Sequence, residues 1–333
     1  MKRTAHLGPM TDKNALAYIC ALLVLFGCAD SEEIEQGKVP ESPPIPHIKA
    51  PQFNSDSAYT YIEEQVALGP RTPNSPAHDS CAAYLKRKFN SFGVEVTSQK
   101  GVVVGWDKAK LNFENITASI NPEATNRILL FAHWDTRPHA DQEKLLKQEP
   151  LDGACDGGSG VGVLLEAARL MAQTKPNVGV DIVLFDVEDY GKSSVANSFC
   201  LGSQYWAKNL PKNYYPKFGI LLDMVGAKGA QFSMEGYSMQ FAPHIVNRVW
   251  KKAAHSGYSS YFIFKRSSPM TDDHYYVNTI AGIPCIDIIQ TDASSRTGFG
   301  SYWHTTEDNM DIIDKSTLKA VGQTILEVVY SEK

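Results

Sequence analysis

A continuous apolar run that ends in acidic residues is the feature that most constrains the fold of this chain. Residues 180–185 read Val-Asp-Ile-Val-Leu-Phe, and the next four are Asp186, Val187, Glu188 and Asp189. A short, nearly apolar run is typical of a strand that is covered on both faces, as in a parallel sheet between helices. Successive side chains at a strand end diverge, so Glu188 and Asp189 can take different roles. An acidic pair alone is more often part of a solvated loop, so the interpretation depends on the rest of the chain.

Apolar strands and amphipathic helices alternate along the rest of the sequence. Strands are expected at 94–104, 111–120, 127–132, 180–187, 218–224 and 284–289, and the first two look like an antiparallel pair. Helices are expected at 56–68, 76–93, 157–173, 201–209, 242–255, from about 272, and at 315–331. This alternation predicts an α/β fold, a three-layer αβα sandwich around a central mixed, largely parallel sheet.

Length and charge limit the kinds of partner. The 333 residues suffice for one large α/β domain, and no internal repeat or linker is visible after residue 50. The net charge is −5 and the pI about 6.0, so there is no basic excess that would indicate nucleic-acid binding. We therefore expect a single domain at 51–333, no nucleic-acid partner, and a monomer.

The N-terminus has the pattern of a targeting segment. Basic residues precede an apolar run at 15–26 that is too short for a permanent membrane span. The run ends Leu-Phe-Gly-Cys28, which resembles a bacterial lipobox whose cysteine becomes the lipidated first residue. The alternative is an ordinary secretory signal with an incidental cysteine. We expect a lipoprotein signal peptide at 1–28, a flexible tether at 29–50, and an exported lipoprotein anchored through Cys28 to a membrane, at the periplasmic face or the cell surface.

The cysteines after Cys28 show no spacing typical of a metal or redox motif. Cys81, Cys155, Cys200 and Cys285 are scattered along the chain. Cys81 falls on an expected helix and Cys285 in an apolar strand, so both are expected in the core. An exported protein can form disulfides, but their pairing does not follow from the sequence.

Histidine and acidic residues cluster where the apolar strands end. They are His133 and Asp135 after one strand, Asp156 before a helix, Glu188 and Asp189 after the central strand, Asp223 at the end of another, and His304 in a later loop. In an open α/β sheet, ligands gather beyond the carboxyl ends of the strands. Histidine and carboxylate ligands together suit zinc. The sequence therefore predicts a metal site at this edge of the sheet.

Each of these residues also has a simpler explanation. Asp156 lies in Asp-Gly-Gly-Ser-Gly, where it could be only a turn residue and helix cap. Asp223 could be a buried carboxylate that is bonded by the backbone. His304, after Trp303, could be a surface loop residue. Their joint placement at strand ends favours the metal site over these separate explanations.

Four motifs carry a resemblance to a known family. They are Ala-His-Trp-Asp-Thr-Arg-Pro at 132–138, Asp-Val-Glu-Asp-Tyr-Gly at 186–191, Thr-Asp-Asp-His at 271–274 and Tyr-Trp-His-Thr at 302–305. Together with the order of the strand-end residues, they resemble the zinc aminopeptidase superfamily. Within it, the chain is similar to the bacterial-type glutaminyl-peptide cyclotransferases, or glutaminyl cyclases. The resemblance covers about residues 55–330.

The resemblance implies one catalytic zinc ion per chain, in a catalytic domain at 51–333. Asp156, Asp189 and His304 would be the zinc ligands, carried over from the family motif. His133, which is a ligand in two-zinc aminopeptidases, would not hold the single metal of a cyclase.

The resemblance also implies an enzyme that converts the N-terminal glutamine of peptides or proteins to pyroglutamate and releases ammonia. Zinc would polarise the γ-carbonyl of the glutamine, and Glu188 would carry the proton from the amine to the leaving ammonia. Asp223 and Asp272 would hydrogen-bond around the reacting centre, and Trp303 would contact the glutamine side chain. The nucleophile belongs to the substrate itself, so proximity is built in.

Three positions depart from the animal cyclases. Asp189 stands where they have a second glutamate; aspartate is a shorter oxygen ligand and looks like the bacterial form. Asp287 stands where they have histidine, so its role is an open question. Their tryptophan in the loop after the Glu pair has no counterpart, because 193–194 are serines. Trp134 and Trp206 are the candidates to supply that wall.

Two other functions remain open. A two-zinc aminopeptidase would use His133 and Asp223 for a second ion bridged by Asp156, and all three residues are present. The long segment after Glu188 resembles the cyclase insertion and favours the cyclase. The third interpretation is a non-catalytic lipoprotein binding module on a peptidase scaffold, against which the intact Glu188 argues.

Overall fold

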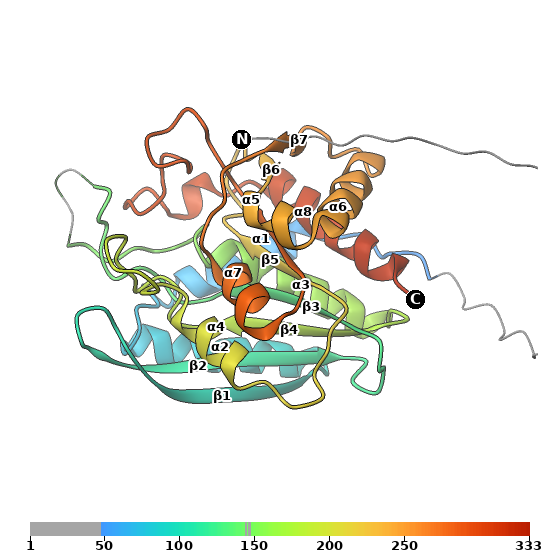
Figure 1. Cartoon of the computed structure of the whole chain (residues 1–333), viewed down its shortest axis with the longest axis horizontal. Coiled ribbons are helices and arrows are strands. Elements are labelled where there is room, and N and C mark those ends of the chain that lie inside the picture. The colour runs from blue at the N-terminus through green and yellow to red at the C-terminus, as the bar shows by residue number, and fades with distance from the viewer. Residues whose placement is uncertain (1–47, 144, 146–147) are drawn as a thin grey trace, which may run out of the picture. The chain divides into compact units, whose positions relative to one another are not determined.

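The computed structural model of the chain describes residues 48–333, apart from 144, 146 and 147 (Figure 1). The expected signal peptide at 1–28, with Cys28, lies outside the described residues, as does almost all of the tether. Both therefore stay predictions. Among the described residues, none of the helices combines the length and the apolar character that a bilayer span requires.

A six-stranded sheet forms the middle layer, in the order β1-β2-β4-β3-β5-β8. Its strands are β1 (Glu95–Val104), β2 (Lys110–Ile120), β3 (Arg127–His133), β4 (Gly179–Phe185), β5 (Gly219–Asp223) and β8 (Cys285–Ile289). The last four run parallel to one another, and β2 runs antiparallel to both β1 and β4. The predicted mixed, largely parallel sheet is confirmed.

Helices cover both faces of this sheet because both faces of its parallel strands are apolar. Leu130 and Ile182 point into a large core shared with α1 (Ser55–Val66), α2 (Pro76–Ser91), α3 (Gly158–Gln173), α6 (Pro243–His255) and α8 (Lys315–Ser331). Their neighbours Phe131 and Val183 point into a second core, shared with α4 (Leu201–Lys208) and η1 (Val277–Ala281). The alternation along each strand thus produces the three layers (Figure 1).

The helices begin where the sequence supplies a cap. Ser75 accepts a hydrogen bond from the backbone N–H of His78 at the start of α2, and Pro76 occupies the first turn. Asp314 accepts from the backbone N–H of Thr317 at the start of α8. Each such cap contributes about 1 kcal/mol to stability.

Two parts of the fold differ from the sequence-based expectation. The helix expected at 242–255 is confirmed as α6, but the short helix α5 (Gly236–Phe241) that precedes Pro243 was not expected. A small parallel sheet of β6 (Phe232–Met234) and β7 (Phe262–Arg266) was not expected. A three-residue strand is too short to leave a periodic pattern in the sequence.

The last third of the chain also holds shorter elements. The helix expected near 272 is a single turn, α7 (Asp273–Tyr276), that continues as the π-helix η1. A 3₁₀ turn, η2 (Met310–Ile312), precedes α8. Short turns of this kind follow tertiary contacts more than local propensity, so the sequence indicated only where this helix begins.

Two glycines let helices approach the strand ends closely. A Cβ on Gly160 of α3 would lie 2.1 Å from the carbonyl oxygen of Leu222 in β5. A Cβ on Gly202 of α4 would lie 2.0 Å from the carbonyl oxygen of Asp186, directly after β4. Any larger residue would push these helices away from the edge of the sheet where the strand-end residues gather.

Candidate metal centre and active site

The predicted strand-end residues meet in one pocket of about 350 Å³ beyond the carboxyl ends of β4 and β5. Its acidic and histidine side chains are Asp156, Glu188, Asp189, Asp223, Asp272 and His304. Every site residue that the sequence analysis proposed, except Trp303, is in that group, and Trp303 lines the pocket as well. Residues separated by up to 148 positions in the sequence, from Asp156 to His304, are therefore brought together by the parallel sheet, as the strand-end rule predicts.

Asp156, Asp189 and His304 are arranged as metal ligands. All three are buried, and each offers one ligand atom within 4.8 Å of the others. His304 Nε2 lies 3.3 Å from Asp189 Oδ1 and 3.8 Å from Asp156 Oδ2. Ligand atoms that surround a zinc ion tetrahedrally at about 2.0–2.1 Å lie about 3.3 Å from one another. One nitrogen and two oxygen donors at this spacing fit zinc, with a fourth position facing the pocket.

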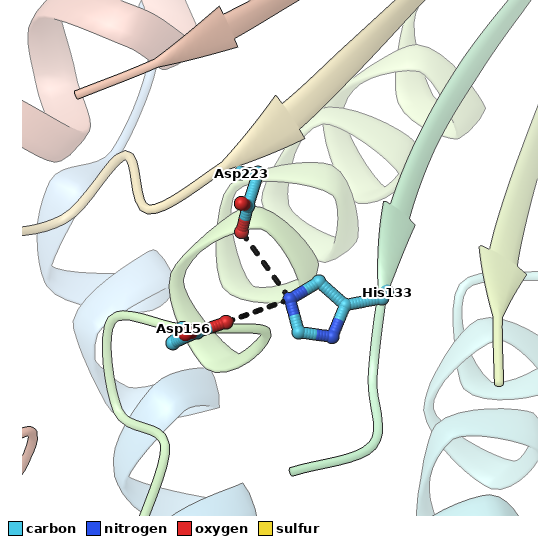
Figure 2. Close-up of side chains that lie close together, drawn as sticks. All are labelled: His133, Asp156 and Asp223. Atoms are coloured by element: carbon cyan, nitrogen blue, oxygen red, sulfur yellow. Dashed lines mark hydrogen bonds and ion pairs between the residues drawn. The ribbon is translucent and has the colours of Figure 1, made fainter. Parts of the chain in front are cut away.

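A second set shares Asp156. His133 Nε2 lies 2.9 Å from Asp156 Oδ1 and 3.2 Å from Asp223 Oδ1 (Figure 2). All three side chains are buried and also meet the general spacing for a metal site. The shorter distance is that of a charge-assisted hydrogen bond. A proton on His133 Nε2 therefore satisfies both carboxylates directly.

The turn after β4 presents Glu188 and Asp189 to the pocket. Val187 has a left-handed backbone (φ 52°), which is rare for a β-branched residue and costs on the order of 1–3 kcal/mol. The buried Asp135 stabilises this turn, because its Oδ1 accepts from the backbone N–H of Glu188 (3.0 Å) and its Oδ2 from that of Asp189 (3.2 Å). The predicted divergence of the two adjacent carboxylates is thus built into the backbone.

Glu188 and Asp189 have opposite electrostatic environments. Desolvation in the pocket, together with the negative charges of Asp189 and Asp272, raises the pKa of Glu188 well above its ordinary value. Burial also opposes ionisation of Asp189, but the positive charges of His304 and Arg137 outweigh it and lower the pKa of Asp189. A carboxylate that stays ionised suits a ligand, and one that readily holds a proton suits a general acid and base.

Two further residues support the ligands from outside the pocket. Arg137 Nη1 donates to Asp189 Oδ1 (3.1 Å), and Asp141 Oδ1 lies 3.1 Å from His304 Nδ1. Burial lowers the pKa of His304, but Asp189 and Asp141 raise it more, to about 9. The Asp141 contact uses Nδ1 and leaves Nε2 of His304 facing the other two ligands, as in carboxylate–histidine–zinc arrangements.

Asp223 and Asp272 complete the acidic side of the pocket. Burial raises the pKa of Asp223 to about 6 and that of Asp272 to about 7, and the charge of Asp223 adds to the shift of Asp272. Oδ1 of Asp272 caps the start of α7 at the backbone N–H of Asp273, while its Oδ2 has no hydrogen-bond partner within the described part of the chain. Both residues are therefore able to accept or hold a proton near neutral pH.

A second buried cluster lies next to Asp272. His274 Nε2 lies 3.0 Å from Glu235 Oε2, and its Nδ1 lies 3.7 Å from Asp287 Oδ2. Burial and the surrounding acids raise the pKa of Asp287 well above its ordinary value. Asp287 is fully buried and does not line the pocket, so its place is behind Asp272 rather than against a substrate.

The apolar wall of the pocket does not contain Trp134 or Trp206, the two candidates that the sequence suggested. Trp303 lines the pocket and stacks on His304, with ring centroids 3.7 Å apart. Trp134 is fully buried and stacks on His78, and Trp206 packs in the second core. Neither lines the pocket.

Phe199 and Phe299 supply that wall instead. Phe199 comes from the segment after Glu188, and Phe299 packs against Trp303 with ring centroids 4.7 Å apart. Sequence reasoning did not select these phenylalanines, nor Asp141 and Arg137 as supports for the ligands. Phe199 lies two residues before the start of α4 at Leu201, and no local sequence pattern marked it as part of the wall.

Comparison with known proteins places the chain in a family. The family described as Peptidase family M28 matches residues 115–329, which is more than half of the sequence. The chain therefore belongs to peptidase family M28.

The similar proteins are described either as a Zn-dependent exopeptidase or as glutaminyl cyclases. A Zn-dependent exopeptidase from Parabacteroides distasonis is 50% identical with a TM-score of 0.83, and the match covers 85% of this chain and 100% of that one. A glutaminyl cyclase from Tannerella forsythia has the same identity, TM-score and coverage. A glutaminyl-peptide cyclotransferase from Gloydius blomhoffii is 24% identical over 300 residues, covering 79% of this chain and 77% of that protein.

Proposed function

We propose that this protein is a zinc-dependent glutaminyl-peptide cyclotransferase, which converts N-terminal glutamine to pyroglutamate and releases ammonia. The observation that carries the proposal is the pocket, where one three-ligand set stands beside Glu188 under a wall formed by Trp303 and Phe199. The similarity to a glutaminyl cyclase at 50% identity supports it.

The reaction needs a group that carries a proton, but it needs no water nucleophile. The α-amine of the glutamine attacks its own γ-carbon, so the two reacting atoms arrive together. A zinc ion held by Asp156, Asp189 and His304 would supply Lewis-acid polarisation of the γ-carbonyl. Glu188 accepts a proton from the amine and returns it to the departing ammonia. General acid–base catalysis of this kind accelerates a reaction about 10²–10⁴-fold. The raised pKa of Glu188 suits both halves of this transfer.

Asp272 and Asp223 help by holding the amine. Both carboxyl groups line the pocket beside Glu188, and both have a pKa close to neutral, about 7 and about 6. They can accept hydrogen bonds from the substrate's N–H groups while Glu188 takes the proton. Trp303 and the phenylalanine wall enclose the curled glutamine side chain and exclude water.

We further propose one zinc ion per chain. The Asp156–Asp189–His304 set leaves space for an ion between its ligand atoms, because His304 Nε2 lies 3.3 Å from Asp189 Oδ1 and 3.8 Å from Asp156 Oδ2. His133 already contacts Asp156 at 2.9 Å, which favours a hydrogen-bonded role for this histidine. Elemental analysis that finds two equivalents, both required for activity, would instead support an aminopeptidase.

The second candidate is a two-zinc aminopeptidase. It is favoured by the complete His133–Asp156–Asp223 set and by the similarity to a Zn-dependent exopeptidase. The third interpretation, a non-catalytic binding module, has no support from the intact Glu188 and ligand set. A paired assay on one sample separates the candidates, with ammonia release from Gln-peptides measured beside amine release from leucine amides. Ammonia without amine supports the cyclase, and amine without ammonia contradicts it.

We also propose that the protein is an exported lipoprotein anchored through Cys28, acting as a monomer on peptides or proteins with N-terminal glutamine and without a nucleic-acid partner. The lipobox-like sequence at 25–28 supports the anchor. Two or three acyl chains hold firmly, since each buried methylene contributes about 0.8 kcal/mol. Cys28→Ser should leave the signal uncleaved or misprocessed. Wild-type protein found wholly in the soluble periplasmic fraction would contradict the anchor.

A further inference from the structure

The loop at 152–156 carries the ligand Asp156 and is bound by a buried carboxylate that the proposed reaction does not use. Asp308 is only 1% exposed. Its Oδ1 accepts from the backbone N–H of Cys155 at 2.7 Å, and its Oδ2 accepts from that of Asp156 at 3.0 Å. We propose that Asp308 is a positioning residue, which fixes the metal ligand Asp156 by binding these two consecutive backbone N–H groups.

The same loop is held from another side by Arg71. This arginine is fully buried, and its guanidinium donates to the carbonyl oxygens of Asp152 and of Gly153, the latter at 2.7 Å. The buried guanidinium of Arg71 thus binds the carbonyls of the loop, while the buried carboxyl group of Asp308 binds its N–H groups. The loop is therefore held through both its carbonyl and its N–H groups by buried side chains of the protein.

Asp308 also ties this loop to the second ligand-bearing segment. Its own backbone N–H donates to the carbonyl of Thr305, the residue after His304, at 3.1 Å. Its carbonyl accepts from the backbone N–H of Ala154 at 3.3 Å. The turn that contains His304 and the loop that contains Asp156 are therefore joined through one residue.

Such positioning has a physical purpose at this site. Asp156 faces two other carboxylates, Asp189 and Asp223, and their mutual repulsion disfavours a compact ligand set without a cation. A backbone fixed by two hydrogen bonds to a carboxylate resists the separation that this repulsion favours. Asp135 makes the equivalent pair of contacts to the N–H groups of Glu188 and Asp189, so both aspartate ligands stand on a peptide that is held in this way.

The inference rests on the proposed metal site, but not on which substrate is used, because Asp156 is a ligand in both the cyclase and the aminopeptidase. Its test is therefore the affinity for zinc, which is independent of the substrate. A negative result in the zinc-affinity test would not contradict the proposed cyclisation. A negative result in the paired substrate assay would not contradict the positioning role, which only zinc affinity tests.

The decisive variant is Asp308→Asn in the full chain. Asparagine keeps the shape but has one acceptor oxygen, and its NH₂ would face a backbone N–H. Zinc affinity, measured by competition with a chromogenic chelator, should weaken about 10–100-fold, the usual effect of losing a residue that orients a ligand. Saturating zinc should restore most of the turnover. Unchanged affinity would overturn the proposal.

Asp314→Asn is the matched control. Asp314 lies six positions further along, and its carboxylate accepts from the backbone N–H of Thr317 at 2.9 Å and from its hydroxyl at 3.0 Å. Its hydrogen bonds within the described part of the chain go to Gly226, Thr317 and Leu318, outside the two ligand loops, so the zinc affinity of this variant should equal that of the wild type. A control affinity that falls as much as that of Asp308→Asn would assign both effects to general destabilisation and overturn the proposal.

Hydrogen exchange on zinc-free wild-type protein gives a test that needs no variant, even if Asp308→Asn does not fold. The backbone N–H groups of Cys155 and Asp156 should exchange slowly in the absence of metal, because Asp308 already holds them. Fast exchange of these two N–H groups, with slow exchange in the neighbouring α3, would show that the metal orders the loop and would overturn the proposal.

Discussion

The two His–carboxylate sets that share Asp156 differ in what their histidines contact. His304 stands 3.3 and 3.8 Å from its carboxylate partners, and its other nitrogen faces Asp141. His133 lies 2.9 and 3.2 Å from its partners (Figure 2). Both sets meet the general spacing for a metal site, but His133 lies closer to its carboxylates, at distances over which it can also donate a hydrogen bond directly. The proposal of one zinc ion assigns the metal to the first set and a hydrogen-bonding role to His133.

Replacing Asp189 by Ala should give the largest effect of any single change in the pocket. The variant loses one of three protein ligands and leaves the charge of Arg137 without its partner. Zinc content should fall far below one equivalent and activity to background, while the core stays folded. Elemental analysis and circular dichroism check these outcomes. A variant that keeps a full equivalent of zinc would show that Asp189 is not a ligand.

Glu188→Gln should separate proton transfer from metal binding. The side chain keeps its size but loses its proton chemistry, so kcat should fall about 10²–10⁴-fold. Zinc content should remain that of the wild type, in contrast to Asp189→Ala. Near-normal turnover would mean that another group moves the proton, and Asp272, with a pKa of about 7, is the next candidate.

His133→Asn should distinguish the two sets most sharply. If His133 only hydrogen-bonds to Asp156 and Asp223, the variant still binds its zinc, with affinity reduced about 10–100-fold. The wild type and this variant should then have the same metal stoichiometry. A drop from two equivalents to one would contradict the account, because His133 would then hold an ion of its own.

The pair of His274 and Glu235 should affect stability and its dependence on pH. Burial opposes ionisation of Glu235, but hydrogen bonds from His274 and from two backbone N–H groups lower its pKa from 4.5 to about 2. This carboxylate therefore stabilises the fold above about pH 4.5, and that contribution disappears as the pH falls toward 2.

Glu235→Gln should consequently destabilise the protein at pH 7 by on the order of 3 kcal/mol, following about 1.4 kcal/mol per pKa unit. Urea unfolding of variant and wild type between pH 7 and pH 2 measures this. The two stabilities should converge as the pH falls. A constant difference across the range would assign the effect to packing rather than to charge.

The sequence predicted the sheet and the cluster of strand-end residues for a physical reason, whereas the family resemblance implied which of them would be the zinc ligands. His133, Asp156, Glu188 and Asp223 lie at or just after apolar strands, or before a helix, and parallel strands bring such ends to one edge. Residues that are far apart in the sequence thereby become neighbours in space. The antiparallel pair and the terminal helix were predictable because their patterns are long, and the central strand was predictable because its short run is almost wholly apolar.

The supports and the walls of the pocket were not predictable in the same way. Asp308, Asp141 and Phe199 act through contacts between loops that are distant in sequence, and no local pattern marks such contacts. Trp134 and Trp206 were reasonable candidates by residue type, but burial in the two cores takes both away from the pocket. The short β6 and β7 pair likewise depends on tertiary packing, not on a periodic pattern.

Mass spectrometry of a Gln-Xaa peptide incubated with the purified protein tests the central claim most directly. Cyclisation removes one ammonia from the N-terminus and leaves every peptide bond intact, so the account predicts a peptide lighter by about 17 mass units. The N-acetylated peptide should not react, since its nitrogen is no longer a nucleophile. Free glutamine together with a peptide shortened by one residue would contradict the account and identify the protein as an aminopeptidase.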